Sequence, residues 1–278
     1  MTQDKEGVYK YLRTEKKFPL MWCSGCGNGI VLGSTLRAID TIGLDANQIA
    51  VVSGIGCSGR ASTYVDFNTL HTTHGRALTF ATGLKLARPE MTVLVVMGDG
   101  DALAIGGNHF IHSARRNIDI TAIIYNNYIY GMTGGQISPT TPPQMIASTA
   151  RAGNIEAAFD VAKLAEAAGA SFVARGTAFH VNQLDELMEK AIRKKGFSVL
   201  DVITQCPPIY GRYNRLGSAT DMMRWQEEHA LELEEAEGLS EEEVKDKFLT
   251  GVFVDEERPE YCEEYERLVN RVQGKEEK

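Results

Sequence analysis

Short apolar runs alternate with longer amphipathic segments through most of the chain. The apolar runs, rich in Val, Ile and Ala as buried strands are, span residues 48–53, 91–97, 119–125, 171–174 and 197–204. The pattern predicts helices that end near residue 42 or span 71–87, 105–116, 160–168 and 181–195. This alternation predicts an α/β fold built on a doubly wound, mostly parallel sheet.

Composition divides the 278 residues into three regions. Residues 1–17 are polar and predict an N-terminal arm, residues 18–208 carry the α/β pattern, and residues 209–278 form an acidic extension. Of the 37 acidic and 29 basic residues, 20 and 8 lie in residues 221–278, so the body is mildly basic although the net charge is −8. A basic body with an acidic tail argues against nucleic acid as the main partner and would suit an acidic protein.

The acidic extension carries helical signals. Ser240 and Glu243 form a capping box ahead of Val244 and Phe248. Apolar residues then recur at i, i+4, i+7 and i+11 after Pro259; they are Tyr261, Tyr265, Leu268 and Val272. We expect amphipathic helices that wrap a partner subunit or the body.

The composition is that of an ordinary globular protein, with 43% hydrophobic and 24% charged residues. No apolar run reaches the length of a membrane span, and the charged N-terminus lacks the apolar core of a signal peptide. We therefore expect a cytoplasmic protein that does not contact membranes.

Two neighbouring predicted strands end in residues suited to a metal ion and a phosphate. A Gly-Asp-Gly-Asp run at 98–101 follows one strand, and Asn127 follows the next. Parallel strand ends emerge at the same sheet edge, so Asp99 and Asn127 should lie close together. Mg²⁺ prefers such oxygen ligands together with phosphate oxygens, and glycines allow the backbone to approach a diphosphate. Such residues also occur in ordinary βα turns, but the matched pair favours a metal–diphosphate site.

Three of the five cysteines lie just after Gly-rich or strand-ending segments, and a fourth belongs to a C-x-x-C pair. Cys23 and Cys26 form a C-x-x-C pair, Cys57 lies in a second Gly-rich turn, and Cys206 follows the last predicted strand. A thiolate site of this kind suits zinc or an iron–sulfur cluster, and the spacing alone does not separate the two. Cys262 matches no motif, and we expect it to be a free thiol.

The segment from Asp99 to Gln136 resembles the thiamine diphosphate motif. Its ending, Asn-Tyr-Ile-Tyr-Gly-Met-Thr-Gly-Gly-Gln at 127–136, resembles the β subunits of 2-oxoacid:ferredoxin oxidoreductases. The resemblance covers most of residues 18–215 and implies a thiamine diphosphate-binding fold. It also implies that Asp99, Asn127 and the main-chain carbonyl of Ile129 hold Mg²⁺.

The resemblance implies further site residues. It places thiamine diphosphate contacts at Ile55, Gly56, Cys57, Ser58, His74, Gly100, Asp101, Gly131 and Met132. It makes Cys23, Cys26, Cys57 and Cys206 the ligands of one [4Fe–4S] cluster, with Cys206 the most remote from its motif. Arg60 and His74 are the candidate catalytic residues. Arg60 could bind a substrate carboxylate or be an ordinary surface residue, and His71, His109 and His112 are expected to be structural.

The resemblance implies coenzyme A-dependent oxidative decarboxylation of a 2-oxoacid, with electrons passed to ferredoxin and possible reversal to fix CO₂. The run after Cys206 looks like the 2-oxoglutarate branch of the family, and pyruvate is the alternative substrate. Thiamine activation needs a Glu from a second domain, for which this chain has no room, so we expect an α subunit and an α2β2 heterotetramer. A non-redox thiamine decarboxylase or synthase subunit, and an electron-carrier module without thiamine, are the other possibilities.

Overall fold

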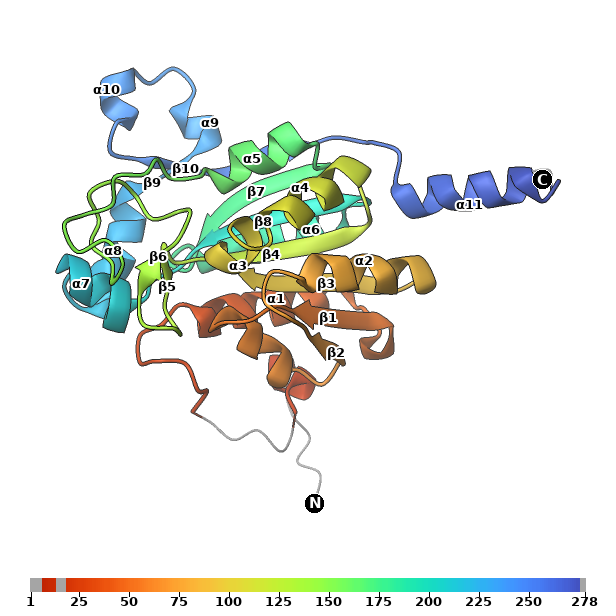
Figure 1. Ribbon diagram of the computed structural model, residues 1–278, viewed down its shortest axis with the longest axis horizontal. Helices are drawn as coiled ribbons and strands as arrows, with labels where there is room; N and C mark the ends of the chain where they lie inside the picture. The colour runs from red at the N-terminus through yellow and green to blue at the C-terminus, as the bar shows by residue number, and fades with distance from the viewer. Residues whose placement is uncertain (1–6, 14–18, 276–278) are drawn as a thin grey trace.

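The structure, a computed structural model, describes residues 7–13 and 19–275. Within these residues one eight-stranded sheet has the order β2-β1-β3-β4-β8-β7-β10-β9 (Figure 1). Its strands are β1 Ile49–Ser53, β2 Asn68–His71, β3 Thr92–Gly98, β4 Ile120–Asn126, β7 Phe172–Thr177, β8 Phe197–Ile203, β9 Ala230–Glu232 and β10 Phe248–Asp255. All neighbours are parallel except β7 and β10. The predicted mostly parallel α/β sheet is confirmed.

Helices cover both faces of this sheet (Figure 1). The helices are α1 Asn28–Ile42, α2 Ala77–Ala87, α3 Asp99–Leu103, α4 Gly107–Arg116, α5 Val161–Ala168, α6 Val181–Arg193, α7 Arg212–Asn214, α8 Ala219–His229, α9 Leu233–Ala236, α10 Glu241–Val244 and α11 Tyr261–Val272. In β3, Val93, Val95 and Met97 pack in the core with α2, α4 and α5, whereas Leu94 and Val96 pack in the core with α1 and α6. The central strands are therefore buried on both faces, as their continuous apolar runs predict.

Three parts of the chain differ from the predicted elements. The helix expected at 105–116 begins at Gly107, and a separate short helix, α3, begins directly at Asp99. The helix expected from His71 to Ala87 begins at Ala77. The exposed edge strand β2 has no apolar pattern to reveal it.

The acidic extension contains two strands as well as helices. The capping box at Ser240 and Glu243 is present, but α10 ends at Val244. Phe248, expected on that helix, begins β10, which pairs antiparallel with β7. The extension therefore returns to the sheet before it leaves again as α11.

The predicted N-terminal arm, residues 1–17, lies largely outside the described residues. Of its described part, Gly7–Tyr11 forms a 3-10 helix, and residue 12 makes a β-bridge to Val65. Among the described residues no helix is long and apolar enough to cross a bilayer.

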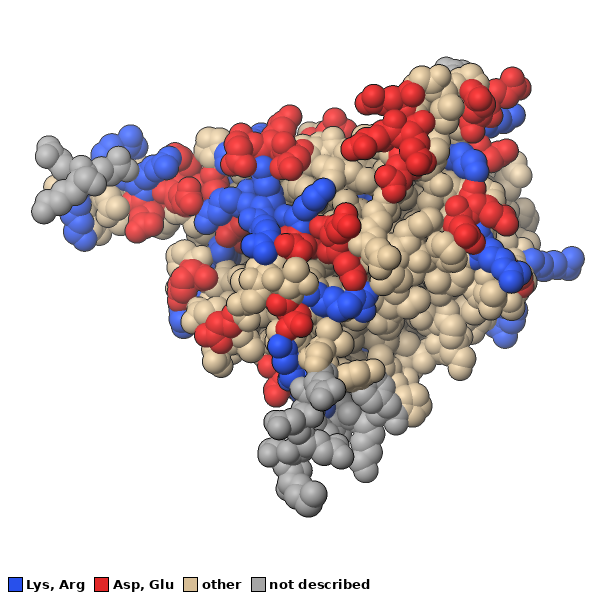
Figure 2. All heavy atoms as spheres, turned by 180° about the vertical axis from the view of Figure 1, so that it is seen from behind, with Lys and Arg blue, Asp and Glu red and all other residues tan. Residues whose placement is uncertain are grey.

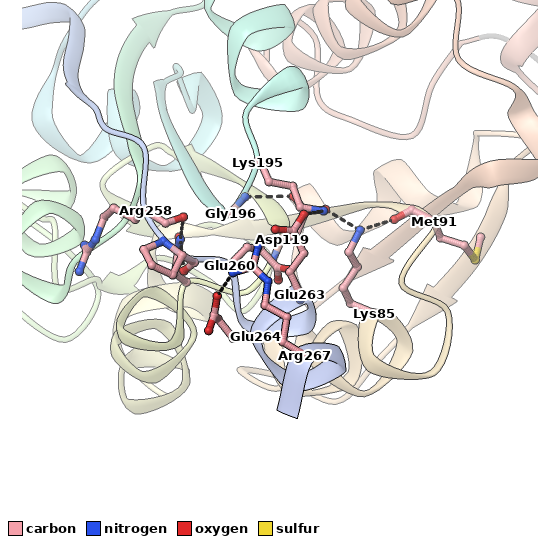
Figure 3. A network of polar contacts seen from close by, with 12 residues as sticks. Lys85, Met91, Asp119, Lys195, Gly196, Arg258, Glu260, Glu263, Glu264 and Arg267 are labelled. Atoms are coloured by element: carbon pink, nitrogen blue, oxygen red, sulfur yellow. Dashed lines mark hydrogen bonds and ion pairs between the residues drawn. The ribbon is translucent and has the colours of Figure 1, made fainter. Parts of the chain in front are cut away.

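A buried polar network lies at the amino-terminal ends of the central strands (Figure 3). The ammonium group of Lys85 is 2.6 Å from Asp119 Oδ2 and donates to the Met91 carbonyl at 2.8 Å. Lys195 is 3.5 Å from the same Asp119 atom. The Glu260 carboxylate accepts the N–H of Asp119 at 3.0 Å and caps α11. The network fixes the first turn of α11 to the body.

Replacing Lys85 by Met should lower the free energy of unfolding by about 3 kcal/mol, because it removes the buried partner of a largely buried carboxylate. Replacing Lys195 by Met is the matched control and should cost at most about 1 kcal/mol, because its side chain is half-exposed. Denaturant titration measures both variants. An equal loss of unfolding free energy in the two variants would contradict the idea that burial makes the Lys85 ion pair the stronger one.

Candidate active site

The site forms where four adjacent parallel strands end. β1, β3, β4 and β8 lie side by side, with Ser53 opposite Val96, Gly98 opposite Tyr125, and residue 126 opposite Ile203. The segments that follow these strands therefore meet at one sheet edge. This edge is the end of the molecule at which β5 (Ile129–Tyr130) and β6 (Gln136–Ile137) lie, opposite α11 (Figure 1).

A cavity of about 140 Å³ opens at this edge. Every residue proposed from the sequence to contact the cofactor or Mg²⁺ lines it: Ile55, Gly56, Cys57, Ser58, His74, Asp99, Gly100, Asp101, Asn127, Ile129, Gly131 and Met132. Gly98, Tyr125, Tyr130 and Thr133 complete the lining. Segments up to 78 residues apart in the chain, from Ile55 to Thr133, are thus brought together, although their roles stay predictions.

Asp99 is almost fully buried at the end of β3, with 2% of its surface exposed. Its Oδ2 accepts hydrogen bonds from the hydroxyl groups of Ser138 and Thr140, both at 2.6 Å. Burial raises the pKa of Asp99 to about 6, and these two hydrogen bonds oppose that shift. A carboxylate held in this way would be stabilised by a bound cation.

Asn127 lies in a tight turn between β4 and β5. The N–H of Ile129 donates to Asn127 Oδ1 at 3.3 Å, and Tyr128 between them adopts a left-handed backbone with φ of 63°. A non-glycine residue rarely adopts this conformation, and such strain gathers at functional sites. The turn places Asn127 and Ile129 in the lining of the cavity that Asp99 also lines, and their role as metal ligands stays a prediction.

Asp101 links the cavity to His74. Its Oδ1 accepts the N–H of Gly75 at 2.7 Å and bonds His74 Nδ1, while its Oδ2 is buried without a hydrogen-bond partner among the described residues. Burial raises the pKa of Asp101, and the Gly75 N–H and the nearby His74 lower it. Any contact of residue 101 with a diphosphate would therefore come from its main-chain N–H in the first turn of α3 rather than from its carboxylate.

Gly100 has a packing role in addition to the predicted cofactor contact. A Cβ atom at Gly100 would lie 2.3 Å from the ring of Tyr130, whose hydroxyl donates to the Gly100 carbonyl at 2.9 Å. The Tyr130 ring also meets His74 edge-on, with centroids 5.9 Å apart. Because Gly100 has no side chain, the Tyr130 ring can pack directly against the start of α3.

The four predicted cluster cysteines lie together beside this cavity. Cys206 Sγ and Cys57 Sγ are both within 4 Å of the point where a Cβ on Gly131 would stand. The pKa of Cys26 is raised to about 12, mainly by burial and with smaller contributions from Cys206, Cys57 and Cys23. Among the described residues, no three His, Cys, Asp or Glu side chains converge closely enough to hold a single metal ion.

Hydrogen bonds hold the cysteine segments against one another. The Gln205 side chain donates to the Gly25 carbonyl at 2.9 Å, and the Gly27 N–H donates to the Gln205 carbonyl at 3.3 Å. The Trp22 indole donates to the Cys57 carbonyl at 2.6 Å. The C-x-x-C turn is therefore joined to both the Cys206 strand and the Cys57 turn.

The remaining candidates lie outside the cavity. Arg60 lies in the 3-10 helix Ser58–Thr63 and does not line the cavity, but its Nε is buried without a hydrogen-bond partner in the described part of the chain. His71 bonds the Ser53 hydroxyl at 2.8 Å, and His112 accepts a long bond from Arg115, which fits their structural reading. Cys262 is buried in the first turn of α11, at the end of the sheet opposite the cavity (Figure 1).

Three residues that shape the site were not predicted from the sequence. Ser138 and Thr140 come from the polar loop after Gln136, and only the general polarity of that loop could have pointed to them. Tyr130 lay within the recognised motif without an expected role. A larger apolar cavity, of about 620 Å³, contains none of the predicted cofactor residues.

Comparisons with known proteins agree with a thiamine diphosphate site at this edge of the sheet. The family model of the thiamine pyrophosphate enzyme C-terminal TPP-binding domain matches residues 54–202. The 2-oxoglutarate synthase subunit KorB of Methanocaldococcus jannaschii is 49% identical over 95% of this chain and 98% of that protein. The KorB of Archaeoglobus fulgidus is 51% identical over 93% and 92% of the two chains. The chain belongs to the β subunits of the 2-oxoacid:ferredoxin oxidoreductases.

A solved structure of this oxidoreductase family has the same fold. It is the 2-oxoglutarate:ferredoxin oxidoreductase from Magnetococcus marinus, with 2-oxoglutarate, coenzyme A and succinyl-CoA bound. One of its chains is similar with a TM-score of 0.85 and 31% identity, over 98% of this chain and 92% of that chain. The likeness includes the C-terminal region, for which the sequence motifs gave the weakest support.

Proposed function

We propose that this β subunit, together with an α subunit, catalyses the coenzyme A-dependent oxidative decarboxylation of 2-oxoglutarate. The products are succinyl-CoA and CO₂, and two electrons leave singly to ferredoxin; the reverse reaction would fix CO₂. The observation that carries the proposal is the Cys57 turn, which lines the cofactor cavity and also places its thiol beside Cys206. The near full-length likeness to 2-oxoglutarate synthase subunits favours 2-oxoglutarate over pyruvate.

The residues present fit Mg²⁺ and thiamine diphosphate. Asp99, Asn127 and the Ile129 carbonyl supply oxygen ligands, and only one of them is a carboxylate, which leaves room for phosphate oxygens and water. The first turn of α3 provides main-chain N–H groups for a diphosphate. When bound, thiamine diphosphate supplies the carbon nucleophile and electron sink that decarboxylation needs.

The cysteines fit a [4Fe–4S] cluster, which would supply one-electron transfer to ferredoxin. Burial raises the thiol pKa of Cys26, Cys57 and Cys206, so these groups stay protonated until a metal replaces the proton. Main-chain N–H groups of Ile209 and Tyr210 favour the thiolate of Cys206.

Two residues of this chain would act on the substrate. Arg60 carries a guanidinium whose Nε lacks a partner among the described residues, and it could bind a substrate carboxylate. His74 donates through Nδ1 to Asp101, so its Nε2 is the atom that can accept a proton or a hydrogen bond. Asp101 therefore fixes the tautomer of His74.

The chain needs a partner for catalysis. The proposed diphosphate site takes up the carboxyl edge of its eight-stranded sheet, and no residue that lines the cavity is a Glu. We propose that an α subunit supplies the Glu that activates the thiamine ring, in an α2β2 heterotetramer. This chain alone should bind the cluster and show no turnover, and activity from the isolated chain would refute the requirement.

Electron paramagnetic resonance of the anaerobically purified αβ complex tests the whole proposal. A radical or reduced-cluster signal that appears with 2-oxoglutarate would support it. A signal with pyruvate but not with 2-oxoglutarate would show that pyruvate is the substrate. If neither 2-oxoacid nor dithionite gives a signal, the protein is a non-redox thiamine enzyme subunit and the cluster proposal fails.

Removing the two hydroxyl groups that bond Asp99 should weaken Mg²⁺ binding. We expect the double variant Ser138→Ala, Thr140→Val to lose about 10- to 100-fold in Mg²⁺ affinity, because hydrogen bonds to a ligating carboxylate orient it and keep it ionised. The Mg²⁺ dependence of thiamine diphosphate binding measures the effect. Thr133→Val is the control, because Thr133 lines the cavity but donates to Gln136 instead. Equal affinities in the two variants would contradict the role of the hydroxyl groups.

A further inference from the structure

α11 extends away from the body (Figures 1 and 2), and its large apolar residues Tyr261, Tyr265, Leu268 and Val272 are exposed. Its first turn is fixed, because Cys262 and the capping residue Glu260 are buried, the latter with 1% of its surface exposed (Figure 3). Beyond that turn, Tyr265 is 53% and Val272 is 77% exposed. The helix is thus fixed at one end and exposes several apolar side chains along its length. Exposed apolar patches of this kind mark interaction surfaces.

The spacing of this face is that of a coiled-coil seam. Its apolar residues are separated by four, three and four positions; they are Tyr261, Tyr265, Leu268 and Val272. This order assigns Tyr261 and Leu268 to d positions and Tyr265 and Val272 to a positions. A seam this narrow pairs with one other helix better than with a broad surface.

The charges beside the seam identify the partner helix. Glu264 and Arg271 both occupy g positions, next to Tyr265 and Val272. In an antiparallel pair of identical helices, the g positions of the two chains face each other, so Glu264 of each copy meets Arg271 of the other. In a parallel pair, the g position of Glu264 would face the e position of Val269, with no opposite charge.

The whole helix repeats this charge order. Its acidic residues lie nearer the body and its basic residues lie toward the tip (Figure 2); they are Glu263, Glu264 and Glu266, followed by Arg267 and Arg271, with Lys275 just beyond the helix. Antiparallel pairing superposes the acidic half of one copy on the basic half of the other. The present bond of Glu264 to Arg267 is exposed, so breaking it costs little.

We propose that α11 binds α11 of a second copy of this chain in an antiparallel, two-fold symmetric pair. The pair joins two αβ halves into the complete assembly, and this part rests on the proposed α subunit. Identical surfaces related by a two-fold axis are self-complementary, as the Glu264–Arg271 arrangement requires. Because a helix of 12 residues buries little area, the contact adds to other contacts between the halves.

Charge reversal in the purified complex tests the pairing. Glu264→Arg and Arg271→Glu should each place like charges together twice per pair. Each single variant should raise the dissociation constant of the assembly into halves by at least about tenfold. The double variant, E264R with R271E, restores opposite charges and should return the constant to the wild-type value. Glu266→Arg reverses a charge on the outer face of α11 and should change nothing.

Sedimentation velocity over a range of concentrations gives these constants without any measurement of activity. If the double variant dissociates as readily as the single variants, the partner is not a second α11. If the single variants assemble like wild type, α11 makes no such contact. If they release the α subunit from this chain, α11 is an α-subunit contact and the proposal is overturned. The electron paramagnetic resonance signal of each variant separates these outcomes from a failure of the proposed reaction.

Discussion

Replacing Asp99 by Asn should abolish 2-oxoglutarate oxidation by the αβ complex. Asp99 is the single carboxylate of the proposed Mg²⁺ site, and without its charge the site should lose both the metal and the diphosphate that the metal anchors. Replacing a residue that only hydrogen-bonds to a metal ligand typically lowers metal affinity or activity by about 10- to 100-fold. Loss of the ligating carboxylate itself should therefore lower turnover by about 100-fold or more. Ferredoxin reduction at saturating thiamine diphosphate measures the loss.

The same replacement should leave the metal-free fold intact or stabilise it. Burial raises the pKa of Asp99 to about 6, above its ordinary value, so the ionised side chain opposes folding above that pH. A neutral Asn removes this cost, and the melting temperature at pH 7.5 without Mg²⁺ should not fall. In wild type, protons should displace Mg²⁺ as the pH drops below about 6. A lowered melting temperature would indicate that inactivity came from misfolding, and wild-type activity would remove Asp99 from the metal site.

Replacing Cys206 by Ser should remove the cluster while thiamine diphosphate still binds. Cys206 is buried, and its thiol lies beside that of Cys57, but it does not line the cofactor cavity. A serine hydroxyl is a poor iron ligand, so iron and acid-labile sulfide should fall from four atoms each per chain to less than about one. Ferredoxin reduction should fall to background because the electrons then have no acceptor.

Cys262→Ser is the matched control for this prediction. Cys262 is also buried, but it lies in the first turn of α11, at the end of the sheet opposite the site (Figure 1). Its replacement should leave iron, sulfide and activity unchanged. Full iron content in the Cys206 variant would show that the fourth ligand lies elsewhere, and loss of thiamine diphosphate binding as well would show that the variant disturbs the whole site.

The sequence predicted the central sheet because its strands are buried on both faces. β3 and β4 are unbroken apolar runs, and the residues that end them are unusual enough to indicate their chemistry. Since parallel strand ends share one edge, the closeness of Asp99 and Asn127 follows from strand order alone. The cavity formed by these turns was therefore predictable before the structure.

What the sequence did not reveal depends on tertiary contacts. β10 lies in an acidic segment whose capping box predicts a helix, and it becomes a strand because the edge of β7 offers it hydrogen bonds. Ser138 and Thr140 are ordinary loop residues until the fold places their hydroxyl groups on Asp99. The bond between Asp101 and His74 joins separate turns that no local pattern relates.

The hydrogen bonds of Gln205 and Trp22 bear on how this enzyme matures. They join the segments of all four cysteines through main-chain and side-chain contacts that involve no thiol. The polypeptide can thus gather its sulfur atoms before any iron arrives. Insertion of the proposed cluster would then be a late step on a folded subunit, and a cluster damaged by oxygen could be rebuilt by reloading iron and sulfide without unfolding the chain.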